Sequence, residues 1–331
     1  MVSLWSNRLT SSATVLALST AALAFSACGG DGAASSGTVP DAAPEASAFP
    51  DAAGTIQELI DEVGPTNQIV ALPSGGTFTP GDERFGFALL DVGGEQILDA
   101  DVAIYGARGA SGKAVGPFPA RLEDLTTEPE FVAQTTAPDD AKGVYVSEFP
   151  FDQPGEWRLA AVVKQSDTLV ATPLATSIIV AENDRIPAVG EQAPAIHTPT
   201  LAEVGGDIES IDTRLPPSSM HEDDLADVLG KEPVVLLFAT PALCQSRVCG
   251  PVVDAAEQLK ATHGDEAAFI HMEIYKDNEL DPTNLRPQVN DYGLRSEPWL
   301  FVIDENGEIA TRIEGAFSVN ELKDALESLL D

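Results

Sequence analysis

Cys244 and Cys249 are the residues of this sequence best suited to chemistry, because a thiolate is both a nucleophile and a metal ligand. Five steps along a regular helix separate two Cα atoms by about 8.7 Å, whereas a disulfide needs a separation below about 7 Å. The two cysteines can therefore form a bridge only if Cys244 lies in a loop before a helix, or if the first helical turn unwinds on oxidation. A bridge coupled to backbone movement suits a switchable bond better than a permanent one.

The segments around the cysteines predict the elements that position them. An unbroken apolar run at residues 234–238 indicates a strand buried on both faces, as in a parallel sheet. Apolar residues at spacings of three and four then predict a helix that ends near His263. The free amides at the start of that helix, together with its dipole, favour a thiolate at Cys244.

The chain beyond this helix continues an α/β pattern. Residues 267–275, 299–304 and 309–313 are predicted strands, with a hairpin turn at 304–307 between the last two. Ser318 is the expected N-cap of a final amphipathic helix at residues 319–330.

This order of strand, cysteine loop, helix, strand, proline, hairpin and helix resembles the thioredoxin-like family, in particular its membrane-tethered, extracytoplasmic thiol-disulfide oxidoreductases. The resemblance covers about residues 187–331 and implies a thioredoxin-like α/β fold for residues 230–331. The segment 292–304 resembles the one that holds the family's cis-proline, a role that falls to Pro298. Residues 250–254 resemble the active-site helix with its proline.

The resemblance also implies a mechanism of thiol-disulfide exchange. Cys244 would attack as a thiolate, Cys249 would resolve the mixed disulfide, and Pro298 would shape the substrate groove. The expected substrates are protein or small-molecule thiols and disulfides, with no organic cofactor and with a membrane reductase as an electron partner. Two features depart from the family: four residues rather than two separate the cysteines, and Leu237 stands near where many members carry a buried carboxylate.

Two alternatives to exchange remain open. The spacing of the cysteines also resembles one group of peroxiredoxins, but those enzymes carry Thr three residues and Pro seven residues before the nucleophile. Here these positions hold Pro241 and Leu237, so thiol peroxidase is the lesser alternative. The other alternative is a non-catalytic binding or scaffolding lipoprotein in which the cysteines form a structural disulfide.

The histidines do not indicate a metal centre. They stand singly in the sequence, so no metal site is predicted among His197, His221, His263 and His271. His271 and Glu273 would share one face of a strand, where Glu273 is either a proton acceptor or half of a satisfied buried pair.

Arg247, between the cysteines, has two interpretations. It either stabilises the thiolate by its charge or is a solvated residue of the helix.

The N-terminus is predicted to be a targeting segment. Residues 1–27 contain a basic residue followed by an apolar stretch and resemble a bacterial lipoprotein signal that ends at Cys28. The resemblance implies that Cys28 is acylated and that the protein is lipid-anchored to the cell membrane on its extracytoplasmic side. The alternative is a plain secretory signal with an incidental cysteine. Residues 28–65 are predicted to be a tether. Its residues 29–54 are expected to be disordered because they are rich in Ala, Gly, Ser, Pro and Asp, and one or two helical turns are expected at 55–63.

Residues 66–182 have the pattern of an all-β domain. Short alternating segments separated by turn signals predict a β-sandwich that resembles immunoglobulin-like domains. The expected strands are 68–72, 84–90, 100–106, 143–149, 155–164 and 168–181. Trp157 is expected to pack in the core, and the absence of Cys and His from this region argues against a nucleophilic or metal site there.

Length and charge limit the remaining possibilities. The 331 residues suffice for two domains, with residues 183–229 as a linker that contains a helix around 222–229. A formal net charge of −35 excludes nucleic acid and anionic membrane surfaces as expected partners, because both would repel the chain.

Overall fold

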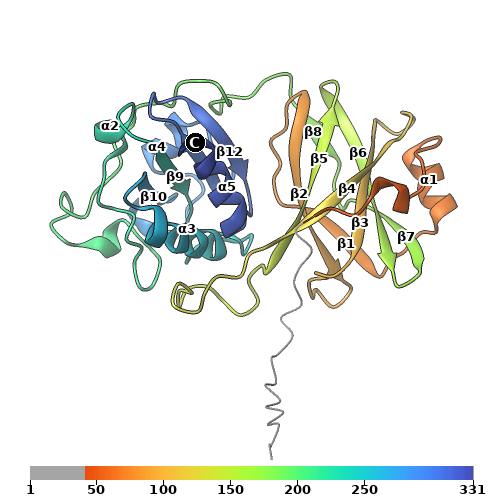
Figure 1. The fold of residues 1–331 in the computed structure, drawn as a ribbon, viewed down its shortest axis with the longest axis horizontal. Helices are drawn as coiled ribbons and strands as arrows, with labels where there is room; N and C mark the ends of the chain where they lie inside the picture. Colours follow the sequence, from red (N-terminus) through yellow and green to blue (C-terminus); the bar gives the residue numbers. More distant parts are fainter. Residues whose placement is uncertain (1–41, 331) are drawn as a thin grey trace, which may run out of the picture. The chain divides into compact units, whose positions relative to one another are not determined.

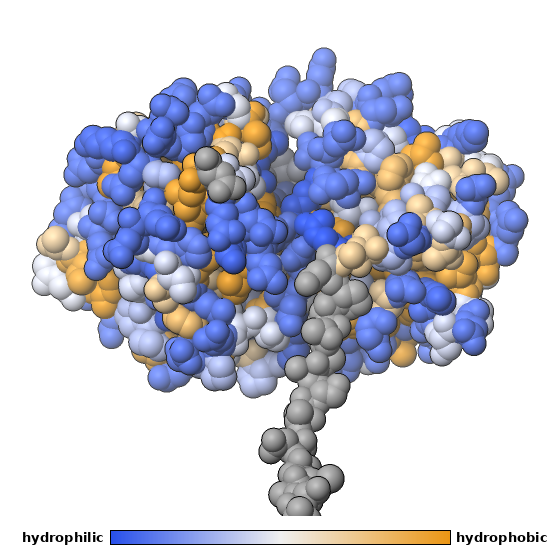
Figure 2. Space-filling view, viewed as in Figure 1, coloured by the Kyte–Doolittle hydropathy of each residue, from blue (hydrophilic) through white to orange (hydrophobic). Residues whose placement is uncertain are grey.

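The computed structural model describes residues 42–330, which contain two β-sheets and their helices (Figure 1). The predicted signal at 1–27, Cys28 and the first part of the tether lie outside the described residues. Within residues 42–330, no helix has the length and apolar character needed to cross a membrane. Hydrophilic side chains cover most of the face shown in Figure 2, as expected for a chain with 53 acidic residues.

The first half of the described chain is an eight-stranded antiparallel sheet. The strand order is β1-β2-β5-β4-β3-β6-β7, and β8 also pairs with β6. Ala71 of the first strand bridges Leu174, which follows β7, so the two ends of the sheet approach each other. The strands are β1 (Ile69–Pro73), β2 (Gly81–Asp91), β3 (Asp101–Arg108), β4 (Val115–Asp124), β5 (Gly143–Phe151), β6 (Gly155–Gln165), β7 (Thr168–Pro173) and β8 (Ile178–Val180).

An aromatic cluster fills the interior of this sheet. Trp157 is 4% exposed and packs edge-on against Phe149 and Phe151, while its indole N–H donates to the carbonyl of Gln153. The expectation that Trp157 belongs to the core is confirmed. Aromatic side chains of this size each bury a large apolar area, which allows a short-stranded sheet to form a core.

The strand predictions match the structure except at two places. β4 was not predicted, because Pro117 and Pro119 within it suppress the strand signal. Both prolines lie in the part of β4, residues 115–120, that pairs with β3. Residues 121–124, which contain no proline, pair with β5. The expected long strand at 168–181 is divided into β7 and β8.

The prediction of a disordered tether is wrong for residues 42–54, which precede α1 and β1. Residues 42–54 pack on the sheet: Phe49 is buried, and the Tyr105 hydroxyl donates to the carbonyl of Pro50 at 2.5 Å. The 3-10 helix η1 (Ala46–Ala48) is followed by α1 (Ile56–Val63), which Thr55 and Glu58 begin with a capping box. The composition of this segment predicts disorder. The segment is ordered because Phe49 packs against apolar side chains on the outer face of the sheet, such as Ala103 and Tyr105.

The second half of the described chain is a four-stranded mixed sheet of order β10-β9-β11-β12. The first two strands of this order are parallel, and the other neighbours are antiparallel. The strands are β9 (Val234–Phe238), β10 (Ala268–Met272), β11 (Trp299–Ile303) and β12 (Ile309–Glu314). All residues of β9 are buried, as its apolar run predicted.

Alternate residues of β9 face two different layers. Val235 and Leu237 pack against α3 (Cys249–His263) and α5 (Val319–Leu330). Val234, Leu236 and Phe238 pack against α2 (Leu225–Val228) and α4 (Pro287–Asp291). Short 3-10 helices, η2 (Ile208–Ser210) and η3 (Lys276–Asn278), occupy the connections. The C-terminal region is therefore an α/β sheet covered on both faces.

The loop between β4 and β5 joins the two sheets. Its Ala133 N–H and Thr136 hydroxyl donate to Oδ2 of Asp254 on α3, at 3.2 and 2.8 Å. Arg214, from the segment before β9, donates two hydrogen bonds to Oδ1 of the same carboxylate. Asp254 thus connects three segments that are remote in sequence.

Candidate functional site

Cys244 lies in the loop between β9 and α3, and Cys249 is the first residue of α3. The two form a disulfide with a Cα–Cα distance of 5.9 Å. This separation is within the range that a disulfide allows. Of the two arrangements that the spacing permitted, the structure has the one with Cys244 outside the helix.

The two sulfur atoms occupy different environments. Cys249 is fully buried, whereas Cys244 is half-buried. The Cys249 N–H donates to the sulfur of Cys244 at 3.4 Å, and the Ser246 hydroxyl lies 3.2 Å from the same sulfur. An amide at a helix start favours negative charge, so this geometry favours a thiolate at Cys244 once the disulfide is reduced.

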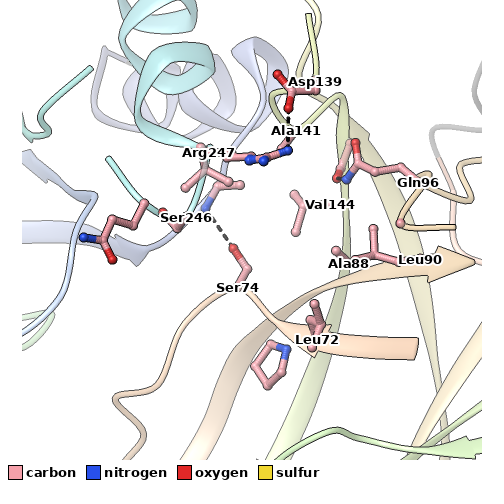
Figure 3. Close-up of a pocket in the computed structure, with 16 residues that line it drawn as sticks. Leu72, Ser74, Ala88, Leu90, Gln96, Asp139, Ala141, Val144, Ser246 and Arg247 are labelled. Atoms are coloured by element: carbon pink, nitrogen blue, oxygen red, sulfur yellow. Dashed lines mark hydrogen bonds and ion pairs between the residues drawn. The ribbon is translucent and has the colours of Figure 1, made fainter. Parts of the chain in front are cut away.

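Arg247 holds the loop between the cysteines against the β-rich half of the chain. Its backbone is left-handed, with φ at 60°, and its carbonyl accepts the Ala141 N–H at 3.0 Å. Its guanidinium pairs with Asp139 at 2.6 Å (Figure 3). The interpretation of Arg247 as a helix residue is wrong, since α3 begins two residues later.

A pocket of about 380 Å³ lies beside this loop (Figure 3). Residues 245–248 form one part of its lining, and strands β1, β2 and β5 contribute the apolar side chains Leu72, Leu90 and Val144. The Ser74 hydroxyl accepts the Ala316 N–H at its edge.

Pro298 immediately precedes β11 and follows a cis peptide bond. The first pair of the β11–β9 register joins Trp299 to Phe238, so Pro298 lies at the end of β9 from which the cysteine loop leaves. Its carbonyl accepts the Gly315 N–H at 2.9 Å.

A buried carboxylate, that of Glu273, follows the end of β10, the strand that pairs with β9 and its Leu237. His271 pairs in register with Leu237, and Glu273 follows two residues later with 1% exposure. One oxygen of Glu273 accepts hydrogen bonds from the backbone and hydroxyl of Thr213, and the Thr213 hydroxyl accepts the Ala242 N–H. Burial raises the pKa of Glu273. The expected burial of both residues is confirmed, but the second Glu273 oxygen has no hydrogen-bond partner among the described residues.

Two histidines that are far apart in sequence meet in the fold. His221 and His271 have ring centroids 5.3 Å apart, and both contact Asp212. Burial alone would raise the pKa of Asp212, but the two imidazoles hold it far below its usual value. The expectation of isolated histidines is therefore wrong for His221 and His271, which lie together in the fold.

Sequence reasoning missed Asp212 and Thr213. Polar residues in a linker that contains prolines have no periodicity that separates buried from exposed positions. The remaining histidines are peripheral: His197 pairs with Asp224, and His263 ends α3 as expected.

Comparisons with known proteins identify no family. No protein-family model and no curated protein matches the chain. Among solved structures, the crystal structure of the Lin-41 filamin domain is 14% identical and covers 36% of this chain and 99% of that chain, with a TM-score of 0.20. A likeness at this level does not establish a shared fold.

Proposed function

We propose that this protein catalyses thiol-disulfide exchange outside the cytoplasm. The observation that carries the proposal is the asymmetry of the cysteine pair: Cys244 is partly exposed and its sulfur receives the first amide of α3, whereas Cys249 is buried. A partly exposed cysteine near a helix start is suited to attack, and a buried partner is suited to resolve. In this proposal residues 230–331 are a thioredoxin-like domain.

The exchange transfers two electrons from the dithiol to a substrate disulfide. The Cys244 thiolate attacks one sulfur of the substrate, forms a mixed disulfide and releases the other substrate sulfur as a thiolate. Cys249, after losing its proton, attacks the Cys244 sulfur, which forms the internal disulfide and releases the second substrate thiolate. Pro298 borders the groove in which the substrate lies. The reverse sequence oxidises a substrate dithiol.

The proposal includes the cellular setting. Cys28 carries lipid and anchors the protein to the extracytoplasmic side of the cell membrane, and the β-rich region is an immunoglobulin-like sandwich. The substrates are protein or small-molecule thiols and disulfides. A membrane reductase supplies electrons, and no organic cofactor takes part.

A redox titration tests the proposal. In the full chain with Cys28→Ser, the state of Cys244 and Cys249 is followed by alkylation and mass spectrometry against thiol buffers of known potential. A midpoint between about −120 and −270 mV, the range of known exchange catalysts, is expected. A disulfide that stays intact below about −300 mV contradicts the proposal.

Single cysteine variants test the assigned roles. With a model disulfide, Cys249→Ser is expected to accumulate the mixed disulfide on Cys244, whereas Cys244→Ser is expected to abolish exchange. Ser328→Ala is the control, because its hydroxyl contacts the Ala325 carbonyl on α5 and neither sulfur atom. Exchange that survives Cys244→Ser would exclude the assigned nucleophile.

A second candidate function is a binding or scaffolding lipoprotein with a structural disulfide. The contacts of Arg247 with Ala141 and Asp139 favour it, because they fix the loop that the disulfide closes. A structural disulfide resists mild reductant, and its loss lowers the melting temperature by an amount consistent with about 2–4 kcal/mol.

A further inference from the structure

Asp212 and His221 come from the segment before β9, and they meet His271 of β10 in the interior of the protein. Their side chains are at most 3% exposed. Nε2 of His221 lies 3.0 Å from Oδ2 of Asp212, and Nδ1 of His271 lies 3.5 Å from the same oxygen. One ligand-type atom from each residue lies within 4.8 Å of the other two.

One neighbour of this cluster orients the ring of His271. Nε2 of His271 lies 3.1 Å from the carbonyl oxygen of Ala239, which can only accept, so this nitrogen carries the proton. In the neutral ring, Nδ1 therefore presents its lone pair to the cluster. A histidine that ligates a metal commonly donates its other ring N–H to a backbone carbonyl in this way.

The carboxylate is held in place by backbone amides. Oδ1 of Asp212 accepts the Arg214 N–H, and Oδ2 accepts the Ser218 N–H, each at 2.7 Å. These contacts set the orientation of the carboxylate independently of the two imidazoles. Such outer hydrogen bonds are typical of ligating carboxylates.

The separations fit a small transition-metal ion. Zinc binds His nitrogen and carboxylate oxygen at about 2.0–2.2 Å, which places tetrahedral ligand atoms about 3.3 Å apart. The two distances to the Asp212 oxygen, 3.0 and 3.5 Å, lie on either side of this value, and the two histidine nitrogens lie within 4.8 Å of each other. We propose that Asp212, His221 and His271 bind one divalent transition-metal ion, with zinc as the ion that suits the ligand set best.

Such an ion would join the segment before β9 to β10. Asp212 and His221 belong to that segment, and His271 lies on β10 and contacts the carbonyl of Ala239, five residues before Cys244. Three protein ligands leave a fourth position, and the Ser218 hydroxyl lies 3.2 Å from Nδ1 of His271. The site does not depend on the exchange proposed above.

Zinc titration of the oxidised full chain with Cys28→Ser, referred to here as wild type, tests this inference, because the closed disulfide keeps the two remaining cysteine sulfur atoms out of the coordination. After treatment with a chelator, wild-type protein is expected to take up one equivalent of Zn²⁺ and to melt at a higher temperature in its presence. His221→Gln and Asp212→Asn are expected to lose this equivalent. His263→Gln, at the end of α3, is expected to retain it.

Two outcomes overturn the proposal. One is wild-type protein without stoichiometric zinc, as expected if the cluster is held only by hydrogen bonds. The other is a folded His221→Gln variant that binds zinc as the wild type does. If the variants do not fold, the absorption spectrum of Co²⁺ bound to wild-type protein decides: nitrogen–oxygen coordination gives visible ligand-field bands without sulfur charge transfer, and their absence rejects the site.

Discussion

At the scale of single residues, the environment of each side chain determines the chemistry of the cysteine loop. Cys244 and Cys249 are identical in type, but Cys244 is partly exposed with its sulfur beside an amide, whereas Cys249 is fully buried. The same contrast separates the histidines. His271 is enclosed, whereas the His197 side chain is 56% exposed and lies beside the carboxylates of Asp224 and Glu203.

His197 is predicted to titrate above its usual pKa of 6.5, because its hydrogen bond to Asp224 raises the pKa more than burial lowers it. Since the folded-state pKa is raised, the stabilisation from this pair is fully present below about pH 6.5 and is lost as the pH rises through the folded-state pKa. NMR titration of the imidazole measures this value. Asp224→Asn should lower it clearly, and Asp227→Asn, which removes a lesser charge, should lower it less. An unchanged pKa in Asp224→Asn would contradict the assignment.

At the scale of elements, caps decide where helices begin. α3 begins at Cys249 without a side-chain cap, and its first amide instead meets the Cys244 sulfur. α5 has a conventional start: the Ser318 hydroxyl accepts the Glu321 N–H at 3.0 Å and donates to Glu123 of β4 at 2.6 Å. One hydroxyl therefore caps a helix and links it to the antiparallel sheet.

Ser318→Ala is predicted to lower the free energy of unfolding by about 1–2 kcal/mol, because it removes a cap and leaves polar groups without a partner in a buried position. Urea denaturation measures the change. Ser328→Ala on the same helix is the matched control. Its hydroxyl donates to the Ala325 carbonyl at an exposed position, so a change within about 0.5 kcal/mol is expected. Equal effects of the two substitutions would show that the cap is not stabilising.

At the scale of the whole molecule, ion pairs of different burial lie where the two sheets meet. The Arg214–Asp254 side chains are 6% and 2% exposed, whereas those of Arg247 and Asp139 are 61% and 66% exposed. Burial raises the pKa of Asp254, while Thr136 and Arg214 oppose that rise. The buried pair also holds the β4–β5 loop, since Arg214 donates to the Phe131 carbonyl at 2.6 Å.

Asp254→Asn is predicted to lower the free energy of unfolding by about 3–5 kcal/mol, because it leaves the Arg214 charge buried without its partner. Asp139→Asn removes one member of the exposed pair and should change stability by about 0–1 kcal/mol. Urea denaturation of both variants gives the comparison. If Asp254→Asn cost no more than Asp139→Asn, the buried pair would not stabilise the fold more than the exposed one.

Features with a local signal were determined by the sequence alone. The buried strand β9, the extent of α3, the hairpin before β12 and the cap of α5 each follow from apolar spacing, turn residues or a capping serine within a few positions. The cysteine pair also belongs to this class, because five residues of separation limit how it can bridge. Local patterns report burial and backbone preference, and these features need nothing more.

Other features were decided only by the tertiary structure. The walls of the pocket come from β1, β2 and β5, the residues before α1 are ordered by contacts with Tyr105, and Asp212 meets a histidine that lies 59 positions further along the chain. A sequence pattern shows which side chains will be buried, but not which buried side chains will contact one another in the fold. That choice depends on chain topology, and here it turns singly placed histidines into a cluster.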